Sequence, residues 1–195
     1  MKERMIDLLF KYKSAFSTHK QSIGAIIGNE VEIVLTVAKA YPTFLRRPPY
    51  SASPRAGESL EVHIQELIYL VVLRKVGYNE QVEVTTPVII TWKNEKSRML
   101  GDFRALNTYN IADRYPILII HETLTKLSQA KFITAMDALN GFHQDLLTEN
   151  TKKLLRMIFH CGLNEYSRMP FGIINETFHY QRMINTIFAG EDSEG

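Results

Sequence analysis

Asp137 is the residue of this sequence best placed to do chemistry, because an apolar run leads directly into it. The run from Phe132 to Met136 has the composition of a β-strand, and Gly141 indicates a turn shortly after the carboxylate. A rigid strand that ends in an acid at the rim of a sheet can hold a catalytic metal ion, since the loop beyond it stays open. On these residues alone, a turn aspartate that hydrogen-bonds its own backbone is the alternative.

Basic residues recur on both sides of a predicted turn at Asn94 and Glu95, and we expect most of them on the arms of a hairpin. They are Lys93, Lys96, Arg98 and Arg104. Cations projected by a hairpin can bind phosphate groups, but charge also protects an exposed sheet edge from association. The pair Lys152 and Lys153 also has two interpretations, a phosphate contact or a solvated entrance to a strand. Both interpretations stay open for the hairpin cations and for this lysine pair.

Other residue types with reactive side chains carry less information. Three histidines and the single cysteine, namely His143, His160, Cys161 and His179, match no familiar zinc-ligand spacing, which favours structural or surface roles. Cys161 has no local sign of a base that would activate it as a nucleophile. One cysteine also excludes an internal disulfide and fits an intracellular chain.

The composition is that of an ordinary globular protein of one or two domains, with 195 residues, 45% hydrophobic and 23% charged. The net charge of +2 is too small to prove a polyanionic partner, so that case depends on where the cations lie. The charged start from Met1 to Asp7 does not fit a signal peptide, and we find no apolar run long enough to cross a bilayer. We therefore expect no membrane association.

Elements that could position these residues follow from periodicity. Helical spacing of apolar residues predicts a first helix over 5–16, and alternation predicts a strand over 30–36 with Val31, Ile33 and Leu35 on one face. The proline-rich stretch 41–54 is predicted to be extended. A helix should then begin at Ser53 and Pro54 and run to about Arg74.

The rest of the chain alternates between strands and helices. Strands are predicted over 82–92, with Pro87 at an edge or bulge, over 131–137, and over 154–159 paired with 165–169. The returning arm of the basic hairpin is expected to continue through Arg104. Helices are predicted over 121–129 and from Asn175 onward, and residues 190–195 form an acidic tail.

Four motifs in this order resemble the reverse transcriptases of gypsy-type long-terminal-repeat retrotransposons. They lie at residues 98–107, 114–117, 136–144 and 168–172, the last followed by Asn175 and Gln181. The similarity extends upstream to the linker Arg47-Pro-Pro-Tyr50 and the helix from Ser53. It implies an α+β chain with a partial right-hand polymerase fold, made of fingers and an incomplete palm, in which an antiparallel sheet packs with helices. The corresponding domains are 1–29 (helix and polar linker), 30–190 (fingers-palm) and 191–195 (acidic tail).

The resemblance implies roles for individual residues. Asp137 matches the first palm carboxylate, which in the family binds both Mg2+ ions of a two-metal phosphoryl transfer, with the Ala138 carbonyl beside it. Phe142 matches the aromatic ring that disfavours a 2′-hydroxyl. Arg98, and less directly Lys93, would face the triphosphate of an incoming dNTP.

Further roles concern the nucleic acid. Phe171 and Gly172 match the loop that packs against nucleotide and template. Nucleic-acid contacts are expected from Lys96, Lys152 and Lys153. The implied partners are an RNA or DNA template-primer and the remaining polyprotein domains, namely thumb, RNase H and integrase, of which we find no sign in this sequence.

The sequence also departs from the family pattern. It contains no Asp-Asp pair, whereas the family places its second and third metal carboxylates in a Tyr-x-Asp-Asp hairpin. Glu176 and Thr177 stand where the family has Ala-Pro, and Glu95 occupies a turn position that favours glycine. We therefore expect a polymerase fragment truncated before the Tyr-x-Asp-Asp motif and inactive alone. The alternative is a non-catalytic remnant or pseudogene product with weak primer-template binding.

Overall fold

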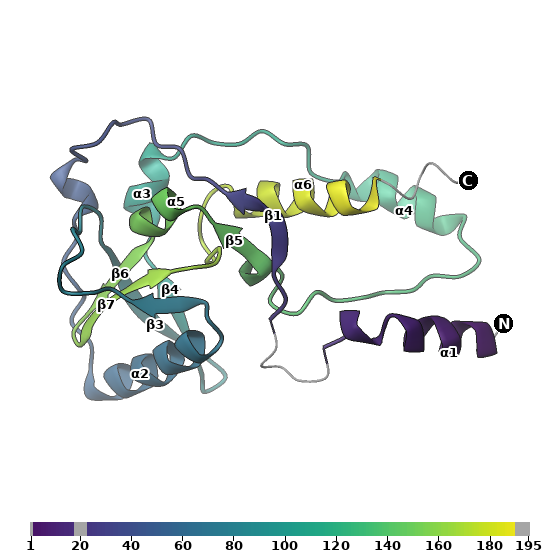
Figure 1. The fold of residues 1–195 in the computed structure, drawn as a ribbon, viewed down its shortest axis with the longest axis horizontal. Helices are drawn as coiled ribbons and strands as arrows, with labels where there is room; N and C mark the ends of the chain where they lie inside the picture. The colour runs from purple at the N-terminus through teal and green to yellow at the C-terminus, as the bar shows by residue number, and fades with distance from the viewer. Residues whose placement is uncertain (1, 18–22, 190–195) are drawn as a thin grey trace.

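The computed structural model describes residues 2–17 and 23–189 of the chain. Figure 1 shows an elongated molecule with a β-rich end and a second end formed by three of the helices, α1, α4 and α6. In chain order the elements are α1 (Lys2–Lys11), η1 (Lys13–Ala15), β1 (Ile26–Val31), η2 (Thr43–Leu45), α2 (Pro54–Tyr69), β2 (Leu73–Lys75), β3 (Thr86–Lys93), β4 (Lys96–Gly101), α3 (Arg104–Tyr109), α4 (Ile120–Ser128), η3 (Gly141–Gln144), β5 (Asp145–Leu147), α5 (Glu149–Leu154), β6 (Arg156–Phe159), β7 (Gly162–Tyr166) and α6 (Glu176–Phe188).

Five strands form the main sheet in the order β2-β7-β6-β3-β4. Neighbours are antiparallel except for β3 and β6, and β1 pairs separately with β5 in parallel. The α+β class and the predominantly antiparallel sheet predicted from the sequence are thus confirmed. Within the parts of the chain that the structure describes, no helix is long and apolar enough to cross a membrane.

The first two predicted elements are only partly right. The first helix, α1, ends at Lys11, and its apolar residues Met5 and Leu9 are 59% and 46% exposed instead of packed. The strand predicted over 30–36 ends at Val31 as β1, because β5 offers a partner only this far. Beyond it Ile33 is still buried and Leu35 half-buried. Pairing there is limited to a single antiparallel bridge between Leu35 and Asn110, so the alternation predicted burial correctly but not a continuous strand.

Helix α2 begins as predicted and ends earlier. The Ser53 hydroxyl accepts the Ala56 amide and caps the first turn, and Leu60 and Ile64 bury the predicted stripe. The helix ends at Tyr69 rather than near Arg74, since Val71 has a left-handed φ of 57° and β2 then pairs with β7. Hydrogen bonding to a distant strand therefore overrides the helical periodicity here.

The hairpin of β3 and β4 turns at Asn94 and Glu95 as predicted. Both residues have positive φ, 48° and 62°, as the two-residue turn requires. Strand β3 is not an edge, because β6 pairs with its start at Pro87 and β4 with the remainder. Arg104 begins α3 instead of continuing the strand.

Of the remaining elements, some are confirmed and one helix was not predicted. Helices α4 and α6 and the β6–β7 hairpin are confirmed, with boundaries shifted by a few residues. Lys152 and Lys153 lie on a helix that the sequence did not reveal, α5, capped by the Thr148 hydroxyl. The acidic tail, including Asp192, lies outside the described residues.

A row of charges runs across three neighbouring strands of the main sheet. Arg74, Glu165 and Arg156 face one another on β2, β7 and β6. The Glu165 carboxylate accepts Arg156 Nε at 2.7 Å and Arg74 Nε at 2.9 Å, and the Glu165 and Arg156 side chains are 1% and 2% exposed. Glu80 completes the network by binding both arginines. Because a slip of one residue would reverse the faces of the strands, this row fixes the sheet register.

We expect Glu165→Gln to lower the free energy of unfolding by about 3 kcal/mol, because it leaves the Arg156 guanidinium buried with less compensating charge. Urea unfolding followed by circular dichroism measures the change. Glu149→Gln is the control, because it removes an ion pair with Lys152 in which the Glu149 side chain is 77% exposed. This substitution should lower the free energy of unfolding by no more than about 1 kcal/mol. Equal effects of the two substitutions would contradict the structural role given to the buried pair.

Candidate functional site

Asp137 lies in an extended segment that pairs with no described strand. Residues 130–138 are exposed and carry no secondary structure, so the strand predicted over 131–137 is wrong. In Figure 1 this segment runs from the far end of α4 back toward β5. A strand requires a hydrogen-bonded neighbour, and an apolar run alone supplies none. The Asp137 carboxylate is therefore exposed on an unpaired stretch of backbone rather than at a sheet rim.

Beyond Asp137, an aromatic cluster joins three segments. Its members are Phe142 and His143 of η3, Phe171 of the loop before α6, and Tyr180 of α6. Phe142 lies 5.4 Å from Phe171 and 5.3 Å from Tyr180 between ring centroids, both edge to face. His143 lies 5.1 Å from Phe171. The structure thus brings together Phe142 and Phe171, two of the site residues predicted from the sequence.

Gly141 has a steric reason to be glycine. A Cβ there would lie 3.0 Å from the Tyr180 ring and hydroxyl, so a side chain at this position would push η3 and the Tyr180 ring apart. Burial, then the negative charges of Asp145 and Asp137, raise the pKa of Tyr180. Both carboxylates thus act on the Tyr180 hydroxyl through their charge.

Gly172 links the predicted nucleotide loop to two helices. Its φ of 99° favours glycine, its carbonyl accepts Asn107 Nδ2 at 2.8 Å, and its amide donates to Glu176 Oε2 at 2.6 Å. Burial raises the pKa of Glu176. Glu176, which departs from the family pattern, therefore accepts the hydrogen bond of the Gly172 amide. The sequence did not reveal this contact.

Asp102 is a second residue that sequence reasoning missed. Its carboxylate, 2% exposed, binds Arg47 at 2.8 Å, the Tyr50 hydroxyl at 2.5 Å and Arg104 at 2.7 Å. These bonds, that from Arg104 foremost, hold the pKa of Asp102 well below its usual range. The linker Arg47-Pro-Pro-Tyr50 is thus fastened to the start of α3. Both motifs were visible in the sequence, but nothing in their spacing indicated this contact.

The predicted phosphate-binding cations of the hairpin are free to meet a ligand. Lys93 and Lys96 face each other across the end of β3 and β4, and Arg98 follows on β4. All three are exposed, and within residues 2–17 and 23–189 none forms an ion pair. Arg104 differs, since its guanidinium is bound to Asp102.

Lys152 and Lys153 lie on α5, a different element from the hairpin. Lys152 Nζ binds Glu149 at 2.6 Å, whereas Lys153 is exposed and lines a cavity of about 640 Å³. Glu80 and Arg156 also line this cavity, and none of the residues from 93 to 98 or 137 to 142 does. The cavity and the aromatic cluster are therefore separate features.

Asp145 is a buried carboxylate that sequence reasoning also missed. It is 2% exposed on β5, directly after η3, and its Oδ2 has no hydrogen-bond partner. Burial raises the pKa of Asp145 to about 6. No pattern in the sequence distinguishes it, since Gln144 and Asp145 read as ordinary polar residues of a turn.

His143 has a structural role beside these carboxylates. Its Nδ1 lies 2.9 Å from the Met169 carbonyl, and because a carbonyl oxygen only accepts, Nδ1 carries the proton. Burial lowers the pKa of His143, so the ring is held neutral. Among the described residues, neither His143 nor His179 belongs to a group that could hold a metal ion. Of the three histidines and the cysteine considered in the sequence, only His160 and Cys161 come together, and the third member of their group is Glu61.

Comparison with known proteins identifies relatives among transposon polyproteins. No protein-family model matches the chain. It is 34% identical over 148 residues, 75% of its length, to the retrovirus-related Pol polyprotein from transposon opus of Drosophila melanogaster. It is 26% identical over 190 residues, 96% of its length, to the Pol polyprotein from transposon gypsy of the same organism. The chain belongs to the retrovirus-related Pol polyproteins of retrotransposons.

The fold is similar to that of solved viral reverse transcriptases. A crystal structure of prototype foamy virus protease-reverse transcriptase superposes with a TM-score of 0.74 at 19% identity, over 97% of this chain and 24% of that one. The foamy viral enzyme in complex with an RNA/DNA hybrid also gives 0.74, at 18% identity and over 97% and 25% of the two chains. The chain spans 15% and 18% of the opus and gypsy Pol polyproteins.

We expect Asp145→Asn to stabilise the protein above about pH 6 by up to roughly 3 kcal/mol, the equivalent of a pKa shift of about two units. A raised pKa means that the folded state holds the proton more tightly than the unfolded one, so stability falls as pH rises from about 4 to about 6. Urea unfolding across this range should show that fall in the unaltered protein and not in the variant. Asp7→Asn, on exposed α1, is the control and should leave the pH dependence in place.

Proposed function

We propose that this Pol segment forms the nucleotide-binding fingers and part of the palm of an RNA-directed DNA polymerase. The observation that carries the proposal is the contact of Phe142 with Phe171, which joins the Asp137 motif to the loop ending at Gly172. The foamy viral enzymes have been solved with an RNA/DNA hybrid and with double-stranded DNA. These relatives support an RNA or DNA template-primer as partner, with a dNTP as substrate.

Different residues of the site would contact the triphosphate, the sugar and the base of a nucleotide. Arg98 and Lys93 are exposed cations without an ion pair among the described residues, suited to offset the charge of a triphosphate. Phe142, anchored by Tyr180, presents a ring on which a sugar can rest, and Phe171 is 47% exposed beside it. Gly172 offers backbone without a side chain, which permits close approach of a base.

Magnesium ions fit this part of the chain only incompletely. The Asp137 carboxylate and the Ala138 carbonyl are oxygen ligands of the kind that Mg2+ prefers. A two-metal site clamps ions about 3.5–4 Å apart and needs further carboxylates. The sequence contains no Asp-Asp pair, and the other carboxylate near Tyr180, Asp145, is buried. These 195 residues therefore supply one arm of such a site and do not complete it.

A polypeptide of these 195 residues should accordingly incorporate no dNTP on a primed RNA template with Mg2+, because the charge of two ions is not offset. Primer extension resolved on a gel provides the measurement. A complete reverse transcriptase in the same reaction shows that template and primer are competent. Robust incorporation that disappears in Asp137→Asn would overturn the proposal that the chain is inactive alone.

Binding of nucleic acid without catalysis is a second candidate function, and the hairpin favours it. Lys93, Lys96 and Arg98 form an exposed basic group, and none of them is neutralised by a carboxylate in the described chain. Lys153 adds a further exposed cation on α5. Phosphate contacts of this kind give affinity that depends steeply on salt and little on sequence.

Replacing both Lys96 and Arg98 with glutamine should weaken binding of an RNA–DNA duplex at low salt. The slope of log affinity against log salt should fall by roughly 2, about one for each lost phosphate contact. Fluorescence anisotropy over a range of salt concentrations measures both quantities. Lys152→Gln is the matched control and should change little, because Glu149 already binds its ammonium group. Absence of binding by the unaltered chain at low salt would exclude this function.

A further inference from the structure

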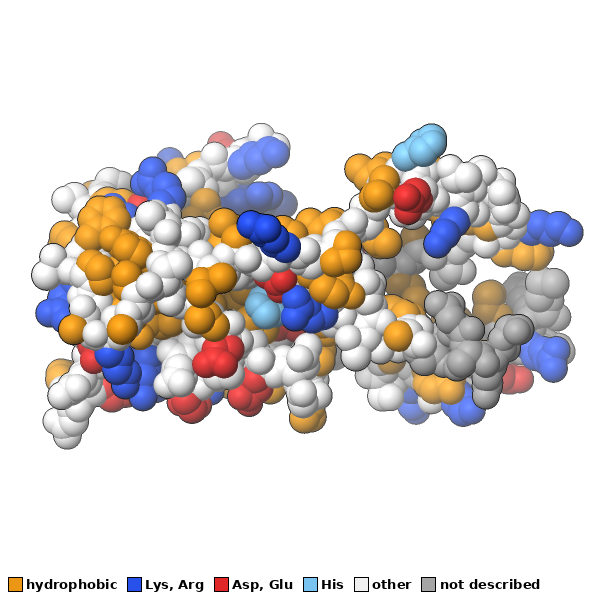
Figure 2. All heavy atoms as spheres, turned by 90° about the horizontal axis from the view of Figure 1, so that it is seen from above, with side chains coloured by type: hydrophobic (Ala, Val, Ile, Leu, Met, Phe, Trp, Pro, Cys, Tyr) orange, Lys and Arg blue, Asp and Glu red, His pale blue; other side chains and the backbone are white. Residues whose placement is uncertain are grey.

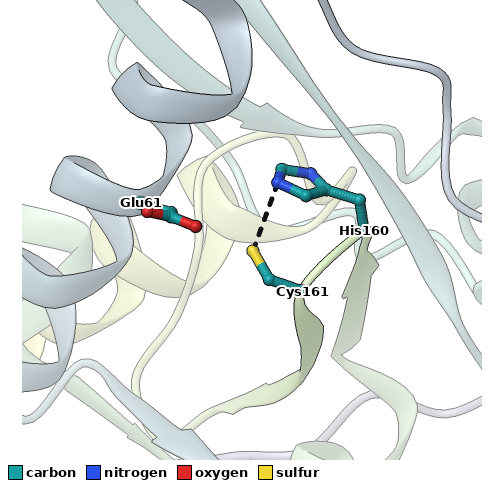
Figure 3. A group of neighbouring side chains, drawn as sticks. All are labelled: Glu61, His160 and Cys161. Atoms are coloured by element: carbon teal, nitrogen blue, oxygen red, sulfur yellow. Dashed lines mark hydrogen bonds between the residues drawn. The ribbon is translucent and has the colours of Figure 1, made fainter. Parts of the chain in front are cut away.

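Three side chains with metal-binding atoms meet between α2 and the turn of the β6–β7 hairpin (Figure 3). They are Glu61, His160 and Cys161, and one oxygen, one nitrogen and the sulfur all lie within 4.8 Å of one another. Figure 3 shows the Glu61 carboxylate pointing from its helix toward the sulfur and the imidazole. None of the three belongs to the nucleotide site proposed above. In the described chain this is the one group of three or more such residues so placed.

The distance between two of these atoms is that of neighbouring ligands on a metal ion. Cys161 Sγ lies 3.4 Å from His160 Nε2. A tetrahedral zinc ion, with Zn–S of about 2.3 Å and Zn–N of about 2.0–2.1 Å, separates its sulfur and nitrogen ligands by about 3.6 Å. The hairpin places the two residues side by side, because Phe159 pairs with Gly162 and leaves only His160 and Cys161 in the turn.

The surface of α2 is shaped to accept the imidazole. Gly57 lies one turn before Glu61 on the same side of the helix, and a Cβ at Gly57 would lie 3.3 Å from His160 Cε1. A glycine inside a helix costs roughly 0.5–1 kcal/mol relative to alanine. Here the missing side chain leaves room for the ring of His160 beside the Glu61 carboxylate.

The charges of the group also favour a cation. A thiolate and a carboxylate this close repel each other. A divalent ion would replace the thiol proton and offset both negative charges.

We propose that Glu61, His160 and Cys161 bind a zinc ion and thereby fasten α2 to the β6–β7 hairpin. Cysteine sulfur, histidine nitrogen and carboxylate oxygen are the three ligand types that zinc accepts, whereas magnesium prefers oxygen alone. All three residues are exposed, so an ion can enter from solvent and water can supply the fourth ligand. The site differs in place and in metal preference from the Asp137 carboxylate.

Cobalt and zinc titrations test the site in the untagged 195-residue chain, kept reduced with a phosphine. Bound Co2+ should give sulfur-to-cobalt charge-transfer absorption that Zn2+ abolishes by displacement. Zn2+ should raise the Tm, because it binds the folded chain. Cys161→Ser should remove the charge-transfer band. His160→Gln and Glu61→Gln should each weaken Zn2+ binding by at least roughly 10- to 100-fold, since loss of a residue that only supports a metal ligand already has an effect of this size.

Matched controls come from the same helix. Glu58→Gln and His63→Gln alter an acid and a histidine of α2 outside the group and should bind Zn2+ as the unaltered chain does. A chain that gives no charge-transfer band with Co2+ in excess overturns the proposal. So does a band that Glu61→Gln and His160→Gln leave unchanged, since Cys161 would then act alone. Asp137→Asn should leave zinc binding intact, which keeps this result separate from the polymerase proposal.

Discussion

The charge row of Arg74, Glu165 and Arg156, in which Glu165 and Arg156 are buried, is the constraint on which the main sheet depends. A carboxylate that is 1% exposed is tolerated because guanidinium groups from both neighbouring strands bind it. The same row requires β2 to leave the helical path of α2, and it holds Glu80 against the sheet. Strand β6, whose register is fixed in this way, pairs with β3, and this pairing positions the β3–β4 hairpin and its cations.

The candidate site depends on contacts between segments that are remote in sequence. The aromatic cluster brings η3, the loop before α6 and α6 itself together, while Asp102 fastens the linker at Arg47 and Tyr50 to the start of α3. Asp137 lies at the margin of this assembly, on a segment with exposed backbone. Figure 2 shows hydrophobic side chains reaching the surface at both ends of the molecule. Apolar residues from Ile117 to Met136 contribute many of the exposed ones.

The helices that were predicted well, α4, α6 and the start of α2, have local signals. Ser53 and Pro54 mark the start of α2, and apolar spacing marks α4 and α6, all within a few residues. Strands were predicted less well because each needs a partner elsewhere in the chain. The run from Phe132 to Met136 has the composition of a strand and pairs with nothing described, whereas Leu73 to Lys75 reads as the end of a helix and is a strand.

By itself the sequence determined the family resemblance, the class of fold and the identity of Asp137, Phe142, Arg98 and Phe171 as site candidates, since ordered motifs carry that information. Only the tertiary structure decided that Phe142 meets Phe171, that Asp145 is a buried acid and that Asp102 binds two arginines. It also brought Glu61 to His160 and Cys161. The physical reason is that burial and pairing arise between residues far apart in the chain, and spacing along the sequence does not encode those distances.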